Sequence, residues 1–117
     1  MPPELNERDR IRLMHMLDAA QQALDFSVGR GRESLDSDAM YRRALVSCIQ
    51  EIGEAAARVT APTRNLVPDV PFKAIVAMRN RIVHVYFDID PDAVWEVVQK
   101  DLPPLVQALQ QVLQRDG

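Results

Sequence analysis

Two arginines, an asparagine, a histidine and a tyrosine lie close together in one largely aliphatic segment, MRNRIVHVYFDID, which starts at Met78. If this segment is helical, Asn80 and His84 share a face, and Arg79 and Tyr86 fall on a neighbouring stripe. A guanidinium holds phosphate oxygens through paired hydrogen bonds, and an imidazole exchanges a proton near neutral pH. The segment therefore predicts a patch suited to a phosphodiester, with the aliphatic residues anchoring the helix.

The same residues also fit a role without chemistry. A histidine near an arginine on a helix is more often structural than catalytic. Tyr86 could bury its ring while its hydroxyl stays in water. Arg81 points to the other side of such a helix, as expected of a solvated charge or of a contact to a partner. The spacing by itself leaves both interpretations open.

Helices are predicted along most of the chain, and they must position this segment. Apolar stripes with helical spacing mark four of them, at about residues 5–28, 38–59, 71 to 86–88, and from 90 onward. Asp90–Pro91 marks the start of the last helix, as an N-cap followed by a first-turn proline, and Pro103–Pro104 should kink or split it. The loop between 60 and 71 has room for a short helical turn. The sequence therefore predicts an all-α, four- to five-helix up-down bundle.

The remaining polar and small residues give weaker signals. Small residues around Gly53 in the second helix would let a neighbouring helix approach closely. His15 is expected to be exposed or structural, and Glu51 and Glu54 to lie on a solvated or dimer-facing side. Neither a metal site nor a cofactor is predicted from two histidines and a single cysteine. Some arginines could bring positive charge toward RNA, although exposed charge flanking helices is the simpler interpretation: Arg30, Arg32, Arg42 and Arg43.

Composition bounds the class of protein. The 117 residues are 47% hydrophobic and 26% charged, which predicts one folded domain covering 1–117. The single cysteine, Cys48, excludes an internal disulfide and fits a reducing cytoplasm. No apolar run approaches the roughly 18 residues that cross a membrane. A net charge of −3 argues against a broad nucleic-acid-coating surface and leaves room for a local basic pocket.

The stretch from Arg79 to Tyr86 resembles the R-x4-H-x-Y motif of the HEPN superfamily, specifically its HepT-like toxin branch. The resemblance covers most of the chain, since four blocks follow in the order and spacing of that branch: RLMHMLDAAQQAL, IQEIGEAAARV, VPFKAIVAMRNRIVHVYFDID and VWEVVQKDLPPL. It implies a HEPN-like helical bundle that dimerises and brings two copies of the motif together across a cleft. It also implies a metal-independent endoribonuclease that acts as the toxin of a toxin–antitoxin pair.

The resemblance also implies roles for individual residues. His84 would be the catalytic acid/base, Arg79 would bind phosphate and stabilise the transition state, and Asn80 would position the substrate or the imidazole. Pairing of two subunits makes chemical sense, because two histidines can act as base and acid in one concerted step. Attack by the ribose 2′-OH of the RNA substrate would then leave a 2′,3′-cyclic phosphate.

Tyr86 takes a separate role by the same resemblance. An MntA-like nucleotidyltransferase antitoxin would transfer AMP to it, and the added charge and bulk beside His84 would block the cleft. Toxin and antitoxin could also form a higher assembly. The residue before Tyr86, often glycine in this branch, is Val85, which stiffens the local backbone. The alternative is a non-catalytic helical partner, or substrate-binding subunit, of a nucleotidyltransferase, which the acidic pI near 5.3 favours.

Overall fold

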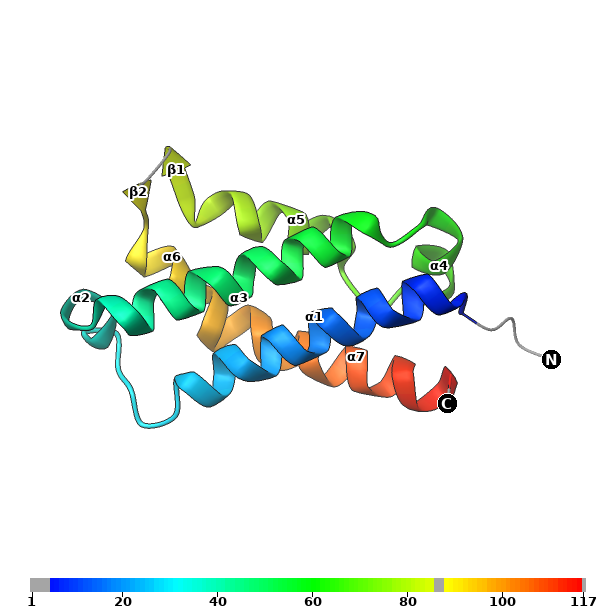
Figure 1. The fold of residues 1–117 in the computed structure, drawn as a ribbon, viewed down its shortest axis with the longest axis horizontal. Helices are drawn as coiled ribbons and strands as arrows, with labels where there is room; N and C mark the ends of the chain where they lie inside the picture. The colour runs from blue at the N-terminus through cyan, green and yellow to red at the C-terminus, as the bar shows by residue number, and fades with distance from the viewer. Residues whose placement is uncertain (1–4, 86–87, 117) are drawn as a thin grey trace.

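Helical runs pass back and forth along the molecule (Figure 1). The structure, a computed structural model, describes residues 5–85 and 88–116, and the side chains of residues 83–85, 88 and 116 stay outside that description. The runs are α1 (Glu7–Phe26), α3 (Ala39–Arg58), α5 (Phe72–Arg81) and a last run of α6 (Pro91–Glu96), η1 (Val97–Asp101) and α7 (Leu102–Asp116). Two short helices, α2 (Ser34–Ser37) and α4 (Ala61–Leu66), lie in the connections. The predicted helical up-down bundle is confirmed.

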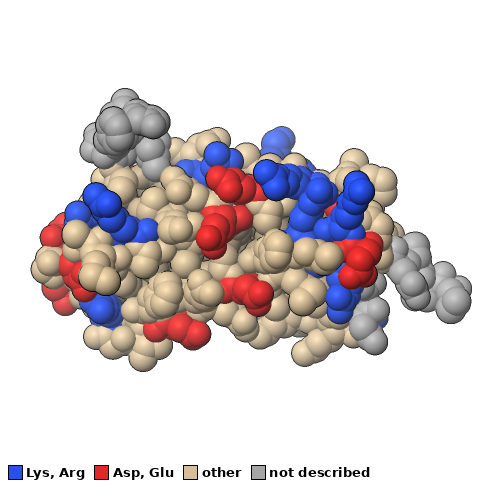
Figure 2. Space-filling model, viewed as in Figure 1, with Lys and Arg blue, Asp and Glu red and all other residues tan. Residues whose placement is uncertain are grey.

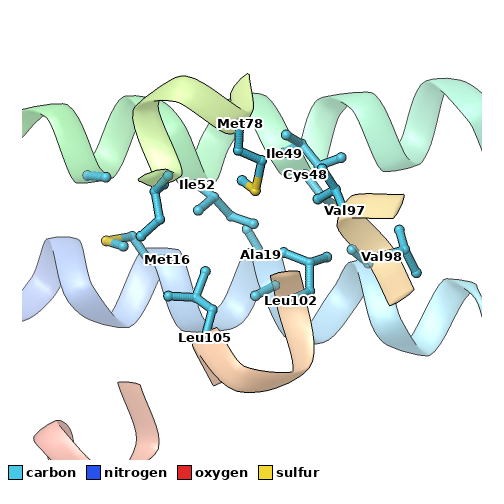
Figure 3. Close-up of a cluster of buried hydrophobic side chains, with 14 of the residues drawn as sticks. Met16, Ala19, Cys48, Ile49, Ile52, Met78, Val97, Val98, Leu102 and Leu105 are labelled. Carbon is cyan, nitrogen blue, oxygen red and sulfur yellow. The ribbon is translucent and has the colours of Figure 1, made fainter. Parts of the chain in front are cut away.

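An apolar core lies between these runs. α1 packs against α3 and α7, and α3 also packs against α5. Figure 3 shows Met78 of α5 in one cluster with Ile49 and Ile52 of α3 and with Leu102 of α7. These four side chains are at most 3% exposed, so each contributes about 1.5–3 kcal/mol to folding. Their burial fixes how closely α5 lies against α3. In the described ranges no helix combines the length and the apolar character that crossing a membrane requires.

A buried aspartate ties the first turn of α1 to the chain that follows α3. Asp9 is fully buried and accepts hydrogen bonds from Asn6 Nδ2 at 2.9 Å and from Thr63 Oγ1 at 2.6 Å, and also from the backbone N–H and the hydroxyl of Thr60. Burial raises the pKa of a carboxyl, but these hydrogen bonds outweigh it and hold the pKa of Asp9 at about 2. The sequence near Asp9 carries no sign of this role, because Thr60 and Thr63 lie 51 and 54 residues further along.

The last run changes pitch just before its two prolines. η1 is a π-helical turn, and the Leu102 N–H donates to the Val97 carbonyl. Pro103 and Pro104 have no N–H for the preceding turn, and their rings crowd it. A locally wider turn is one of the ways in which a helix accommodates such a disturbance. The disturbance predicted at Pro103–Pro104 is therefore present, and its form is a π-turn.

The predicted course of α5 is wrong at its C-terminal end. The helix ends at Arg81 and does not reach 86–88. The chain then forms β1 (Val83–Val85), which pairs antiparallel with β2 (Asp88–Ile89). The Asp90 N–H closes this hairpin by donating to the Ile82 carbonyl at 2.9 Å. The cause is local: the β-branched and aromatic residues after Arg81 prefer an extended backbone. His84 therefore does not share a helix face with Asn80.

Candidate active site at the end of α5

The stem of Arg79 lies against α3. Arg79 is half-buried in the last turn of α5. A Cβ built on Gly53 would be 2.6 Å from Arg79 Cδ, 3.2 Å from its Cγ and 3.0 Å from its Cβ. Carbon atoms in contact are about 3.5–4.0 Å apart, so a side chain at position 53 would overlap the arginine stem. The close helix approach predicted for the small residues around Gly53 is confirmed, and α5 is the helix that approaches.

The guanidinium of Arg79 remains available to a ligand. Within the part of the chain that the structure describes, it makes no hydrogen bond or ion pair. Arg81, two residues further on, behaves differently, because its Nη2 donates to Asp101 Oδ2 on η1 at 2.9 Å. A free guanidinium presents donors in a planar fork that fits phosphate oxygens. The two arginines of this turn thus have different roles. Arg81 links α5 to η1, and Arg79 can bind an anion.

Asn80 lies between these arginines and is exposed. Successive residues on a helix are about 100° apart, so Asn80 points to solvent while Arg79 faces α3 and Arg81 faces η1. Its amide can donate to and accept from a group bound beside Arg79. The last turn of α5 therefore offers one charged and one neutral hydrogen-bonding side chain next to each other.

His84 lies in β1, three residues beyond the end of α5. Its side chain falls outside the described part of the structure, and Tyr86 falls outside it altogether. The backbone places Arg79 and His84 on consecutive elements, because β1 leaves α5 directly after Ile82. The two residues of extended chain from Ile82 to His84 span at most about 7 Å. The hairpin therefore starts close to the end of the helix that carries Arg79.

The motif and the helices around it match one known family over most of their length. The sequence model of the family described as "Ribonuclease HepT-like" matches residues 16–112 of this chain. The match runs from within α1 to within α7 and includes α5 and the hairpin. The chain belongs to the HepT-like ribonuclease family. The resemblance carried by the four sequence blocks is thereby confirmed.

Relatives of this HepT-like chain carry ribonuclease names. In Methanocaldococcus jannaschii, "Putative RNase MJ1380" is 30% identical over 93 residues, which are 80% of this chain and 85% of the relative. In Caldanaerobacter subterraneus subsp. tengcongensis, "Putative RNase TTE0752" is 29% identical over 89% of this chain and 93% of the relative. In Thermococcus cleftensis, "Probable ribonuclease HepT" is 31% identical over 62 residues, 53% of this chain and 56% of the relative. No solved structure matches the chain.

A second polar region of the HepT-like bundle lies in a groove between α1 and α3. The groove has a volume of about 370 Å³, and His15, Glu51 and Glu54 line it together with Arg12 and Arg58. His15 and both glutamates are exposed, as expected. Among the described residues, no group of three or more His, Cys, Asp or Glu side chains is arranged to hold a metal ion. Asp18 also lines the groove, so its lining holds three carboxylates and two arginines and differs in this from the last turn of α5.

The arginines near α2 are engaged within the protein. Arg30 pairs with Asp38 at 2.8 Å, and Arg32 pairs with Asp92 at 2.7 Å. Arg42 donates to the Leu35 carbonyl at 2.6 Å. Figure 2 shows Lys and Arg interspersed with Asp and Glu on this face, and the most crowded basic group lies at the end opposite the hairpin. The simpler prediction for Arg30, Arg32 and Arg42, charge that flanks helices, therefore describes these residues better than an RNA-binding strip.

Cys48 contributes no nucleophile to this family member. Its side chain is buried in the core. Burial raises the pKa of the thiol to about 11, and the nearby charge of Glu51 adds to this effect. The thiolate is the reactive form of cysteine, so Cys48 stays an unreactive thiol at neutral pH.

Proposed function

We propose that residues 1–117 form one HEPN-like domain that cuts RNA as a metal-independent endoribonuclease, without a cofactor, and that acts as the toxin of a toxin–antitoxin pair in the cytoplasm. The observation that carries this proposal is the state of Arg79. Its stem is packed on Gly53, its guanidinium has no partner in the described part of the chain, and it precedes His84 by five residues in the family-matched region.

In the proposed reaction, His84 of one subunit takes the proton from a ribose 2′-OH. The 2′-oxygen attacks the adjacent phosphorus, and the bond from phosphorus to the 5′-oxygen breaks. His84 of a second subunit protonates the leaving 5′-oxygen, since one imidazole cannot be both base and acid in a concerted step. The products are a 2′,3′-cyclic phosphate and a 5′-hydroxyl. A homodimer with two facing motifs supplies both histidines.

Arg79 would stabilise the charge that grows on the phosphate oxygens during this step. A fixed, partly desolvated cation is most effective when it does not have to reorganise during the reaction. The packing of its stem against α3 supports that role. Asn80, exposed beside it, would hold the substrate or orient the imidazole.

Regulation would act on Tyr86. An MntA-like nucleotidyltransferase antitoxin would transfer AMP from ATP, so that the tyrosine oxygen bonds to the α-phosphate and pyrophosphate leaves. The phosphodiester formed in this way adds negative charge two residues from His84 in the sequence. RNA would then be excluded by charge repulsion and by the bulk of the adenosine.

The test is cleavage of RNA by purified protein in EDTA, after mass spectrometry has verified that Tyr86 carries no AMP. Arg79→Ala and His84→Ala should lose activity. Arg81→Ala is the matched control, because it removes an arginine from the same turn and should keep activity. Cyclic-phosphate ends made at similar rates by the wild type and by Arg81→Ala, at a rate at least about 100-fold lower by Arg79→Ala, and not by His84→Ala, are the expected result. Equal cleavage by His84→Ala would overturn the catalytic assignment.

The alternative is a non-catalytic partner or substrate-binding subunit of a nucleotidyltransferase. One observation favours it: the net charge is −3, and Arg30, Arg32 and Arg81 are paired with carboxylates. The positive charge of these three arginines is therefore balanced within the protein and adds little to a surface for RNA. Absence of cleavage by unmodified wild-type protein, together with stable binding to the nucleotidyltransferase, would select this function.

A further inference from the structure

We infer that Gly53 is a positioning residue for Arg79. Because Gly53 has no side chain, the stem of Arg79 lies directly on α3, and this contact sets where the guanidinium lies. This inference rests on the proposed role of Arg79 and deepens it. Its starting point is the overlap between the arginine stem and any side chain at position 53. A Cβ there would be 2.6 Å from Arg79 Cδ, the carbon that carries the guanidinium.

Glycine at this position is unfavourable for the helix itself. Gly53 lies well inside α3 (Ala39–Arg58), and alanines follow at positions 55–57. Replacing an alanine by glycine inside a helix costs about 1 kcal/mol of stability. The backbone of Gly53 is helical, so it does not need the conformational freedom of glycine. The space above the backbone, occupied by the Arg79 stem, is what glycine provides here.

The surrounding core makes Arg79 the part that must yield. On α3, Ile52 and Ala56 on either side of Gly53 are fully buried. Met78 of α5 and Ile82, which directly follows α5, lie before and after Arg79 and are 3% and 0% exposed. Close-packed cores resist displacement, so neither helix can move away easily. A methyl group at position 53 would therefore turn the outer stem of Arg79 about its side-chain torsions. Its 3.0 Å distance from Arg79 Cβ, which no side-chain torsion changes, would also press the last turn of α5 outward by a few tenths of an ångström.

The consequence for the proposed reaction is a misplaced cation. Restoring ordinary contact from 2.6 Å requires Cδ to move by about 1 Å. A displacement of that size at a reacting centre lowers rates by as much as about 100-fold. Gly53→Ala should therefore reduce kcat/KM for RNA cleavage by between about 10-fold and 100-fold, even though alanine is the better helix former.

The experiment is a double-mutant cycle with Gly53→Ala, Arg79→Ala and the double variant, measured by single-turnover cleavage with enzyme in excess. Gly53→Ala should lower the rate in the wild-type background and leave it unchanged in the Arg79→Ala background. Ala57→Gly, an exposed change on the same helix, should lower stability without slowing cleavage of the folded protein. An unchanged rate for Gly53→Ala, or equal losses in both backgrounds, would overturn the inference.

A second measurement does not depend on cleavage. The Arg79 Nε–H resonance, assigned by its loss in Arg79→Ala, should shift and become more mobile in Gly53→Ala. If wild-type protein fails to cleave RNA, the proposed function fails, and this resonance still decides the inference: an unchanged signal overturns it. The overlap with Arg79 could keep Gly53→Ala by itself from folding. In that case, folding of the double variant supports the inference that the Arg79 stem needs the space over Gly53, and failure of both variants to fold overturns it.

Discussion

Arg81 and Asp101 join the last turn of α5 to the π-turn η1 through a 2.9 Å ion pair between side chains that are 50% and 41% exposed. Ion pairs with this much solvent contact contribute about 0.2–1 kcal/mol. The contact also engages the arginine that lies two residues after Arg79 in the sequence. Within a single helical turn, Arg81 therefore has a structural role, and Arg79 is the candidate catalytic arginine.

Breaking this pair should have a small effect. Arg81→Ala and Asp101→Ala should each lower the free energy of unfolding by less than about 1 kcal/mol, with less effect at high salt. Both variants should keep RNA cleavage. Urea denaturation at two salt concentrations checks the first statement. A loss of cleavage in Arg81→Ala while Asp101→Ala keeps it would show that Arg81 contacts RNA.

Arg79 should tolerate no substitution, but the losses should be graded. Arg79→Ala should reduce kcat/KM by about 100-fold to 1,000-fold, as for other groups that stabilise transition-state charge. Arg79→Lys should lose less, because it keeps the charge but not the planar fork. Steady-state cleavage of one RNA by both variants checks the order. If lysine and alanine are equally poor, geometry rather than charge is the contribution of Arg79.

Asp9 should make the free energy of unfolding depend on pH in the acidic range. Its pKa is held at about 2 in the folded protein, below the ordinary 3.8, so its stabilising contribution is present above pH 3.8 and is lost as the pH falls toward 2. The contribution is about 2 kcal/mol. Urea unfolding between pH 5 and pH 2 measures it.

Asp9→Asn should lack this pH dependence and should be less stable at pH 7, because its amide brings a donor to face the Thr60 and Thr63 donors. Asp25→Asn, on an exposed position of α1, is the control and should leave the pH dependence in place. If the free energy of unfolding of Asp9→Asn changed with pH as steeply as that of the wild type, the pH dependence would come from other carboxylates.

Modification by the antitoxin should occur at Tyr86 alone. The chain has two tyrosines, and the other, Tyr41, is 4% exposed and donates its hydroxyl to Ser27 Oγ at 2.7 Å. Incubation with the cognate nucleotidyltransferase and ATP should add AMP to the wild type and to Tyr41→Phe but not to Tyr86→Phe. Intact mass and peptide mapping check this. Tyr86→Phe should still cleave RNA in the presence of the antitoxin, and labelling of that variant would contradict the assignment.

The extent of α3 could be predicted because its apolar stripe repeats at helical spacing without interruption, and the helix observed at Ala39–Arg58 falls within the expected 38–59. Its N-cap is Asp38, whereas the sequence offered Asp36 or Ser37 for that position. The start of α6 after Asp90 follows from its capping aspartate and proline in the same way. The end of α5 could not be predicted, because the segment after Arg81 satisfies a helical stripe while its residues prefer a strand. Tertiary pairing with β2 decides between them.

The geometry around the candidate site was only partly predictable. The small residues around Gly53 indicate a close helix approach, but which helix approaches depends on the tertiary packing of α5. The position of Asp9 likewise depends on Thr60 and Thr63, which no local pattern connects to it. Long-range pairings of this kind follow from the packing of the bundle and not from periodicity.

The even number of long helical runs has a practical consequence for attachment. Because each run reverses the direction of the one before it, α1 begins and α7 finishes at the same end of the molecule, and the β1–β2 hairpin lies at the other (Figure 1). A purification tag, a fluorophore or a surface linker joined beyond either helix would start at that shared end. Immobilised through such a linker, the protein would present the hairpin outward, which suits it to surface-based measurements of RNA and antitoxin binding.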